Sequence, residues 1–79
     1  MKITLKLLAT YEKFLPPAAS GGDYEIDVPE GSKASDILKQ NNVPVDLSTV
    51  ILVNGRTPPA DDLLQEGDIL CAFPVATGG

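Results

Sequence analysis

Histidine and tryptophan are absent from this chain of 79 residues, and cysteine occurs once, as Cys71. Histidine is the commonest general base and the commonest metal ligand in proteins, so its absence removes most familiar catalytic and metal-binding arrangements. One thiol can neither form an internal disulfide nor hold a zinc ion or an iron–sulfur cluster by itself. The sequence also has no glycine-rich loop ending in Lys-Ser or Lys-Thr, the pattern typical of ATP sites. We therefore expect no self-contained enzyme, no metal site and no bound cofactor.

Basic residues are scarce as well, with 6 lysines and arginines against 11 aspartates and glutamates, which leaves a net charge of -5. A charge of this sign disfavours nucleic acids and anionic membranes as partners and favours a basic or apolar protein surface. No apolar run approaches the roughly 20 residues that a membrane-spanning helix needs. Residues 1–6 alternate instead of forming a signal-peptide block, so we expect a cytoplasmic protein that starts at or near Met1.

Four segments have the pattern of β-strands. In the first, the apolar residues Ile3, Leu5 and Leu7 alternate with polar ones, which is typical of a half-buried strand. The others are expected at about residues 24–28, 50–53 and 68–73. Prolines and glycines between these segments predict turns and loops.

One short amphipathic helix is predicted from about residue 33 to residue 40. Ala34, Ile37 and Leu38 have the i, i+3, i+4 spacing of a buried helix face, and Ser32 is placed to cap the N-terminus. A single further helical turn is expected over residues 61–64, with Asp61 as its cap.

The predicted order is strand, strand, helix, strand, strand. The simplest packing lays a mixed sheet across the helix, with the first and last strands parallel in its middle. This α+β arrangement is the β-grasp, or ubiquitin-like, fold. We expect residues 1–74 to form the domain and residues 75–79 to form a flexible tail that ends in Gly-Gly.

Both faces of the last two strands are apolar, although only one of them can cover the helix. Ile69, Cys71 and Phe73 alternate with Leu70 and Ala72, and the preceding strand repeats this doubling. A second apolar face on a small domain marks a partner-binding surface. By analogy with ubiquitin-like folds, we expect Leu52, Phe73 and Leu8 to lie on it. The alternative is that long loops cover this face, and for Cys71 we favour inert packing over a role as a sulfur relay.

The internal motifs and the C-terminal residues together resemble the ubiquitin-like sulfur carriers. These include the small subunit of molybdopterin synthase and the sulfur carrier of thiamin biosynthesis. The matching features are the opening residues 2–10, Asn54-Gly55, Gly67-Asp68, Phe73-Pro74 and the terminal Gly78-Gly79. Val75 stands where the molybdopterin branch usually has a second proline, and Val75-Ala76 is similar to an apolar pair of the thiamin branch. We favour the molybdopterin type and keep the thiamin type as an alternative.

The resemblance implies a function for the Gly79 carboxylate. A carboxylate is ionised at neutral pH and is a poor electrophile, so it must be activated. In the family, an E1-like partner enzyme uses ATP to form an acyl-adenylate, and a persulfide or sulfide displaces AMP. The resulting C-terminal thiocarboxylate gives its sulfur to a large synthase subunit or a thiazole synthase. Gly78 has no β-carbon and would pass through a narrow channel. Phe73, Pro74, Leu52, Leu8 and Val75 are the residues we expect to contact the partners.

Two other functions are compatible with the same residues. A ubiquitin-like modifier would join Gly79 to lysines of other proteins through the same adenylate. A non-covalent β-grasp interaction domain would use the apolar face alone, and its tail would be incidental. Covalent adducts in cells would distinguish the modifier, and survival of function without Gly78-Gly79 would distinguish the interaction domain.

Overall fold

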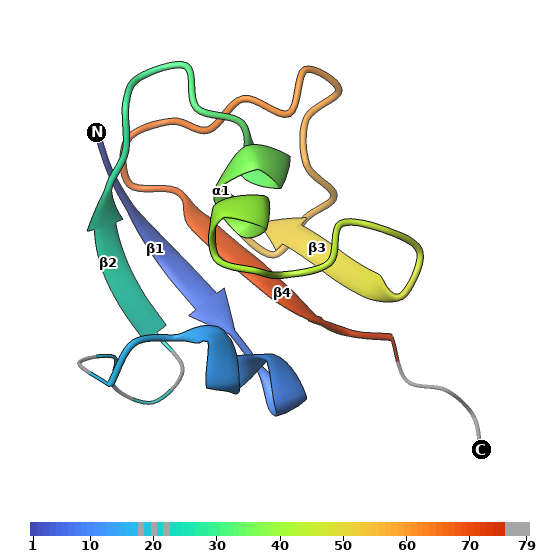
Figure 1. Cartoon of the computed structure of the whole chain (residues 1–79). Coiled ribbons are helices and arrows are strands. Elements are labelled where there is room, and N and C mark those ends of the chain that lie inside the picture. The colour runs from blue at the N-terminus through green and yellow to red at the C-terminus, as the bar shows by residue number, and fades with distance from the viewer. Residues whose placement is uncertain (18, 20, 22, 76–79) are drawn as a thin grey trace.

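Two strands from opposite ends of the chain form the centre of the sheet. The computed structural model describes residues 1–17, 19, 21 and 23–75. Strand β1 (Lys2–Leu7) runs parallel to β4 (Ile69–Pro74), and each pairs on its other side with an antiparallel strand, β2 (Asp23–Asp27) or β3 (Thr49–Val53). The strand order is therefore β2-β1-β4-β3 (Figure 1). This topology confirms the predicted β-grasp arrangement.

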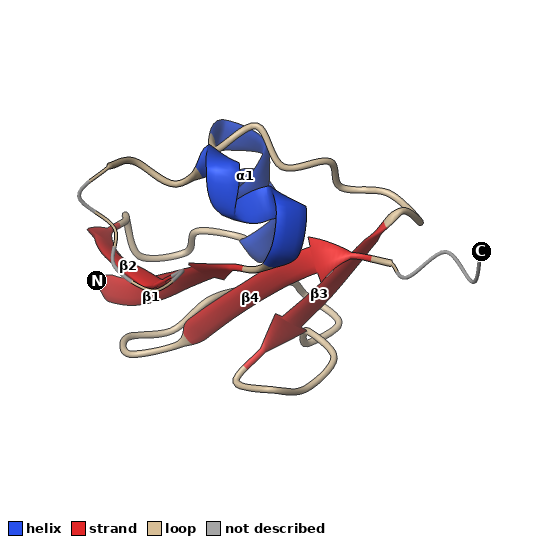
Figure 2. Cartoon of the chain, turned by 90° about the horizontal axis from the view of Figure 1, so that it is seen from below, coloured by secondary structure: helices blue, strands red, loops and turns tan. Residues whose placement is uncertain are grey.

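Helix α1 (Ala34–Gln40) lies across one face of the sheet and makes the second layer of the fold (Figure 2). Its buried residues are Ala34, Ile37 and Leu38, the three that share the predicted apolar face. The helix ends at Gln40 with Asn41 as its C-cap, and Asn42 then takes a left-handed backbone conformation with φ of 67°. Asparagine tolerates this region better than most residues, which explains why the helix stops here.

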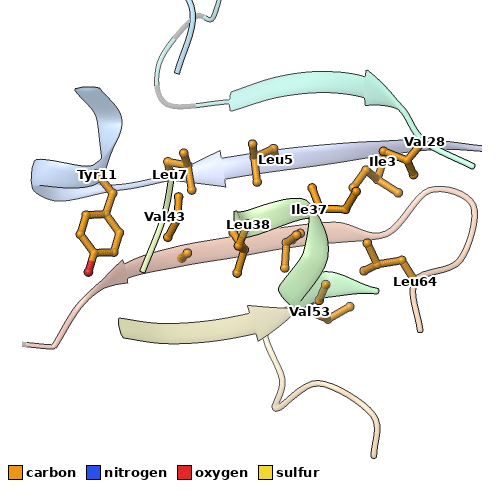
Figure 3. Close-up of a cluster of buried hydrophobic side chains, with 13 residues drawn as sticks. Ile3, Leu5, Leu7, Tyr11, Val28, Ile37, Leu38, Val43, Val53 and Leu64 are labelled. Carbon is orange, nitrogen blue, oxygen red and sulfur yellow. The ribbon is translucent and has the colours of Figure 1, made fainter. Parts of the chain in front are cut away.

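The core lies between α1 and the facing side of the sheet (Figure 3). Alternate residues of β1 point into it, as the sequence pattern predicts, and the same holds for Leu70 and Ala72 of β4. The largest fully buried side chains are Ile3, Leu5, Leu7, Ile37, Leu38 and Leu70. Removing this apolar surface from water stabilises the sheet and the helix against each other.

A 3-10 helix, η1 (Ala9–Phe14), follows β1 directly and was not expected from the sequence. It brings Tyr11 to the start of β3, where the tyrosine hydroxyl and the hydroxyl of Thr49 are 2.7 Å apart. Both residues are 8% exposed, so this hydrogen bond is buried. The predicted loop between the first two strands therefore begins with an ordered element.

Two predictions from local sequence patterns are wrong, the Ser32 cap and the helical turn at residues 61–64. The hydroxyl of Ser32 donates to the carbonyl of Pro29 instead of accepting from helix α1. The carboxylate of Asp62 accepts from the backbone N–H of Ser35 in its place. Residues 61–64 form no helical turn: residues 60–61 are in a turn, and Leu63 makes an isolated β-bridge with Lys33. This loop packs against the start of the helix, so a contact distant in sequence overrides the local capping pattern.

Candidate functional site

The last strand carries the chain to the predicted reacting end. Pro74 is the final residue of β4 and lies opposite Thr49 of β3. The backbone N–H of Val75 donates to the carbonyl of Ser48 at 2.9 Å, so the chain is still held to the body at residue 75. Gly78 and Gly79 lie outside the described residues, as does the rest of the predicted tail beyond Val75.

The face of the sheet opposite α1 carries an apolar surface, which we call the outer patch. It consists of Val50, Leu52, Ile69, Cys71 and Phe73. Phe73 lies opposite Val50 and Cys71 lies opposite Leu52 in the β3–β4 ladder, so each pair shares this face. Ile69 is 42% exposed and the other four are half-buried. The structure thus places Leu52 and Phe73 on one face, away from the helix.

Of the other three predicted contact residues, Leu8 and Val75 lie at the end of this patch where the chain leaves β4, whereas Pro74 lies opposite the buried Thr49, on the side of β4 that faces the core. The N–H of Leu8 donates to the carbonyl of Ala72 at 3.1 Å, which extends the parallel pairing and brings Leu8 beside Phe73. Leu8 is 36% exposed, Val75 is 41% exposed, and Pro74 is half-buried. These side chains surround the start of the tail, so a protein that holds the tail would meet them.

The opposite half of the outer face is charged. Asp23, Glu25 and Asp27 of edge strand β2 are exposed, and each lies opposite a residue of β1. Lys6 forms an ion pair with Asp23, with Nζ and Oδ1 separated by 3.7 Å. The face therefore changes from an acidic edge at β2 to an apolar surface over β4 and β3. Two of these carboxylates, Asp27 and Asp23, lie opposite Lys2 and Lys6 of β1, so this half of the face carries charges of both signs. A partner surface that is apolar in one part and charged in another would match it.

Cys71 lies in the outer patch, next to Lys6 of the neighbouring strand. Burial raises the pKa of its thiol, because an apolar environment disfavours the thiolate. Lys6 opposes this rise in pKa and Asp23 adds to it. A raised pKa keeps the sulfur protonated at neutral pH, and the thiolate is the nucleophilic form. This favours the packing role that we expect for Cys71.

Leu47 is an exposed apolar residue that sequence reasoning missed. Its side chain is 98% exposed, in the loop between α1 and β3. Asp46 and Ser48 flank it, and Ser48 is the residue whose carbonyl binds the N–H of Val75. The only sequence signal was a leucine between two polar residues and outside any periodic pattern.

A shallow cavity of about 450 Å³ lies at the other end of β3 and β4, away from Val75. Its lining includes Val53, Asn54, Arg56 and Asp68. The side-chain amide of Asn54 donates a hydrogen bond to the carboxylate of Asp68 at 2.9 Å, which joins the turn after β3 to the turn before β4. Among the described residues, no group of three or more acidic, cysteine or histidine side chains is placed to hold a metal ion.

No helix in the described part of the chain has the length and apolar character needed to span a membrane.

Comparison with known proteins gives one family and two similar structures. The family described as Mut7-C ubiquitin matches residues 1–78. A Pyrococcus furiosus protein, provisionally assigned as molybdopterin converting factor subunit 1, superposes with a TM-score of 0.69 at 22% identity, covering 95% of this chain and 98% of that one. SAMP1 from Haloferax volcanii superposes with a TM-score of 0.74 at 19% identity, covering 100% of both chains. At such identities the two structures establish a shared fold. No curated protein matches the chain.

Proposed function

This chain belongs to the Mut7-C ubiquitin family, and from that membership we propose that it is a sulfur carrier that acts through the carboxylate of Gly79. In this role the protein is a substrate of an activating enzyme and a sulfur donor to a second enzyme. It is not itself the catalyst. The proposal requires that Gly79 carries the terminal carboxylate of the mature protein.

The observation that carries the proposal is the position of β4. A central strand of the sheet ends at Pro74, the chain is held to the body as far as Val75, and the outer patch lies beside this point. From Val75 to Gly79 there are five residues, which span at most about 17 Å when extended. That length lets Gly79 enter an active site of another protein while the outer patch contacts the surface around it.

The chemistry has two balanced steps. An oxygen of the Gly79 carboxylate attacks the α-phosphorus of ATP, an acyl-adenylate forms, and pyrophosphate leaves. Hydrosulfide then attacks the acyl carbon, a C–S bond forms, and the C–O bond to AMP breaks with its electron pair on AMP. The product is a C-terminal thiocarboxylate. If a persulfide is the donor, a second thiol must also reduce the S–S bond.

Gly78 and Gly79 suit these steps because neither has a side chain. The passage that brings Gly79 to ATP can then be closed around the backbone, which keeps water from the acyl-adenylate. Val75, 41% exposed, is the last described residue that could contact the mouth of such a passage.

We favour the molybdopterin-type pathway as the recipient of the sulfur. The Phe73-Pro74 pair fits that branch of the carriers, and one of the two similar structures is assigned to molybdopterin conversion. A thiamin-type recipient remains the alternative. The two are separated by testing which purified acceptor, a large molybdopterin synthase subunit or a thiazole synthase, takes sulfur from the thiocarboxylated protein.

Intact mass spectrometry tests the proposal. The protein is incubated with the adenylating enzyme of its own organism, ATP and hydrosulfide, and its mass should rise by the difference between a sulfur and an oxygen atom. A variant lacking Gly78 and Gly79 is the control and should keep its mass. The proposal fails if the full chain keeps its mass while a known carrier is converted by its own enzyme under the same conditions. It also fails if peptide mapping of the natural protein finds residues beyond Gly79 that are not removed.

A further inference from the structure

Leu47 exposes far more of its side chain than the other exposed large apolar residues. It is 98% exposed, whereas Ile69, Val75, Leu63 and Leu8 lie between 36% and 42%. An isolated exposed leucine is common on protein surfaces and by itself indicates nothing. Two further properties of its loop, its order and its position, distinguish Leu47.

The loop holds Leu47 in a fixed place. The carboxylate of Asp46 accepts from the backbone N–H of Ser48 at 2.8 Å and also from the Ser48 hydroxyl. The N–H of Thr49 donates to the Asp46 carbonyl at 3.2 Å. These hydrogen bonds from Ser48 keep the pKa of Asp46 below its usual value, so the carboxylate is charged at neutral pH. A braced turn reduces the backbone freedom that is lost when Leu47 binds, so the remaining cost is that of ordering one leucine side chain.

The loop also lies beside the start of the tail. Ser48, next to Leu47, accepts the backbone N–H of Val75. Four residues separate Val75 from the end of Gly79, and they reach at most about 14 Å. The active site that acts on the Gly79 carboxylate therefore lies within about 14 Å of Val75, and an interface of ordinary size around the tail would include the neighbouring loop. The shallow cavity and the acidic edge have no such connection to the tail.

We propose that Leu47 and Val75 together form an anchor that enters an apolar pocket at the mouth of the enzyme that adenylates Gly79. This inference rests on the proposed function and specifies its first partner. The charged carboxylate of Asp46 lies next to the anchor, so the rim of the pocket carries a basic residue. Leu47 acts in binding and positioning, and it takes no part in the chemistry.

The test measures ATP–pyrophosphate exchange by the adenylating enzyme as a function of carrier concentration. Replacing Leu47 with serine (L47S) should raise KM about tenfold or more and leave kcat unchanged, because the anchor acts before the chemical step. Leu47→Met should restore a KM close to that of the natural protein, since methionine keeps the apolar contact. Leu63→Ser is the matched control: this leucine is 38% exposed and lies at the cavity end of the sheet.

The outcomes separate this inference from the function on which it rests. If the natural protein supports no exchange, the proposed function falls and the anchor falls with it. If the natural protein is active and Leu47→Ser has an unchanged KM, only the anchor is overturned. An equal rise in KM for Leu47→Ser and Leu63→Ser also overturns it, because a general loss of apolar surface would then explain both. A rise specific to Leu47→Ser supports it.

Discussion

Asp62 caps helix α1 from a loop that lies 27 residues away from Ser35 in the sequence. One oxygen of its carboxylate accepts the backbone N–H of Ser35 at 3.1 Å and the Ser35 hydroxyl at 2.5 Å. The Asp62 carbonyl accepts the N–H of Ala34 at 2.9 Å as well. The loop after β3 therefore accepts hydrogen bonds from free backbone N–H groups in the first turn of the helix. These bonds hold the loop against the helix.

Replacing Asp62 with alanine should lower the free energy of unfolding by about 1.5–4 kcal/mol, the sum of two effects. The lost cap contributes about 0.5–2 kcal/mol. Alanine would also be strained at a φ of 62°, a conformation that costs about 1–2 kcal/mol without a stabilising side chain. Urea denaturation followed by circular dichroism measures the change. Asp61→Ala is the control, because exposed Asp61 bonds only within its own turn, to the N–H of Leu63. If the free energy of unfolding falls equally in the two variants, the Asp62 cap does not stabilise the fold more than the local bond of Asp61.

The sheet and helix could be predicted because their signals are local. In β1, each apolar residue is two positions from the next, and a strand buries alternate residues whatever its neighbours are. The apolar face of α1 is encoded in the same way by Ala34, Ile37 and Leu38. Once the elements and their order are known, few ways of packing four strands on one helix remain.

The features that could not be predicted from the sequence all depend on contacts that no local pattern encodes. Asp62 reaches Ser35 across 27 residues, and Tyr11 reaches Thr49 across 38. The exposure of Leu47 depends on what fails to cover it, which is a property of the whole fold. The outer patch was predictable in part, because apolar residues on both faces of β3 and β4 exceed what one helix can cover.

The buried bond between Tyr11 and Thr49 should appear in a double-mutant cycle. Tyr11→Phe leaves the Thr49 hydroxyl buried without its partner, and we expect a loss of about 1–3 kcal/mol of stability. Thr49→Val alone should cost a similar amount. The double variant should cost less than the sum, because both unsatisfied groups are then removed. If the two losses in free energy of unfolding, measured by urea denaturation, simply add in the double variant, the two hydroxyls do not interact directly.

Cys71 should react slowly with alkylating agents in the folded protein. Because burial raises the pKa of its thiol, the thiolate fraction at a given pH is lower than in the unfolded chain. The rate of alkylation by iodoacetamide should therefore rise with pH along a curve displaced to higher pH than that of the urea-unfolded protein. Cys71 is the only thiol, so the modified mass reports on one site.

The neighbours of Cys71 supply a check on the sign of this shift. Lys6 stabilises the thiolate and Asp23 disfavours it. Lys6→Gln should move the alkylation curve to still higher pH, and Asp23→Asn should move it to lower pH. A native curve that coincides with the unfolded one, or a reversed order of the two variants, would show that the sheet does not perturb the thiol.

The outer patch should contribute to binding of the adenylating enzyme that we propose as partner, independently of the tail. Phe73 is half-buried, close to the exit of β4, and its aromatic ring is the largest apolar side chain of the patch. Central aromatic residues commonly dominate protein interfaces, so Phe73→Ser should weaken binding by about 30-fold or more. Isothermal titration without ATP measures this affinity, and thermal unfolding verifies that the variant is folded.

Comparison of Phe73→Ser with Leu63→Ser then locates the docking face. Leu63 is an exposed leucine on the loop that forms a β-bridge with Lys33, just before α1, so its loss should leave the affinity unchanged. If Phe73→Ser binds as tightly as the natural protein, the outer patch is not the docking face. A partner would then recognise only the tail and the loop beside it.

If Phe73→Ser and removal of Gly78-Gly79 each weaken binding, and their effects add, the enzyme holds the body and the tail through separate contacts. Binding of the body would then position Gly79 in the active site of an enzyme that supplies the catalytic groups.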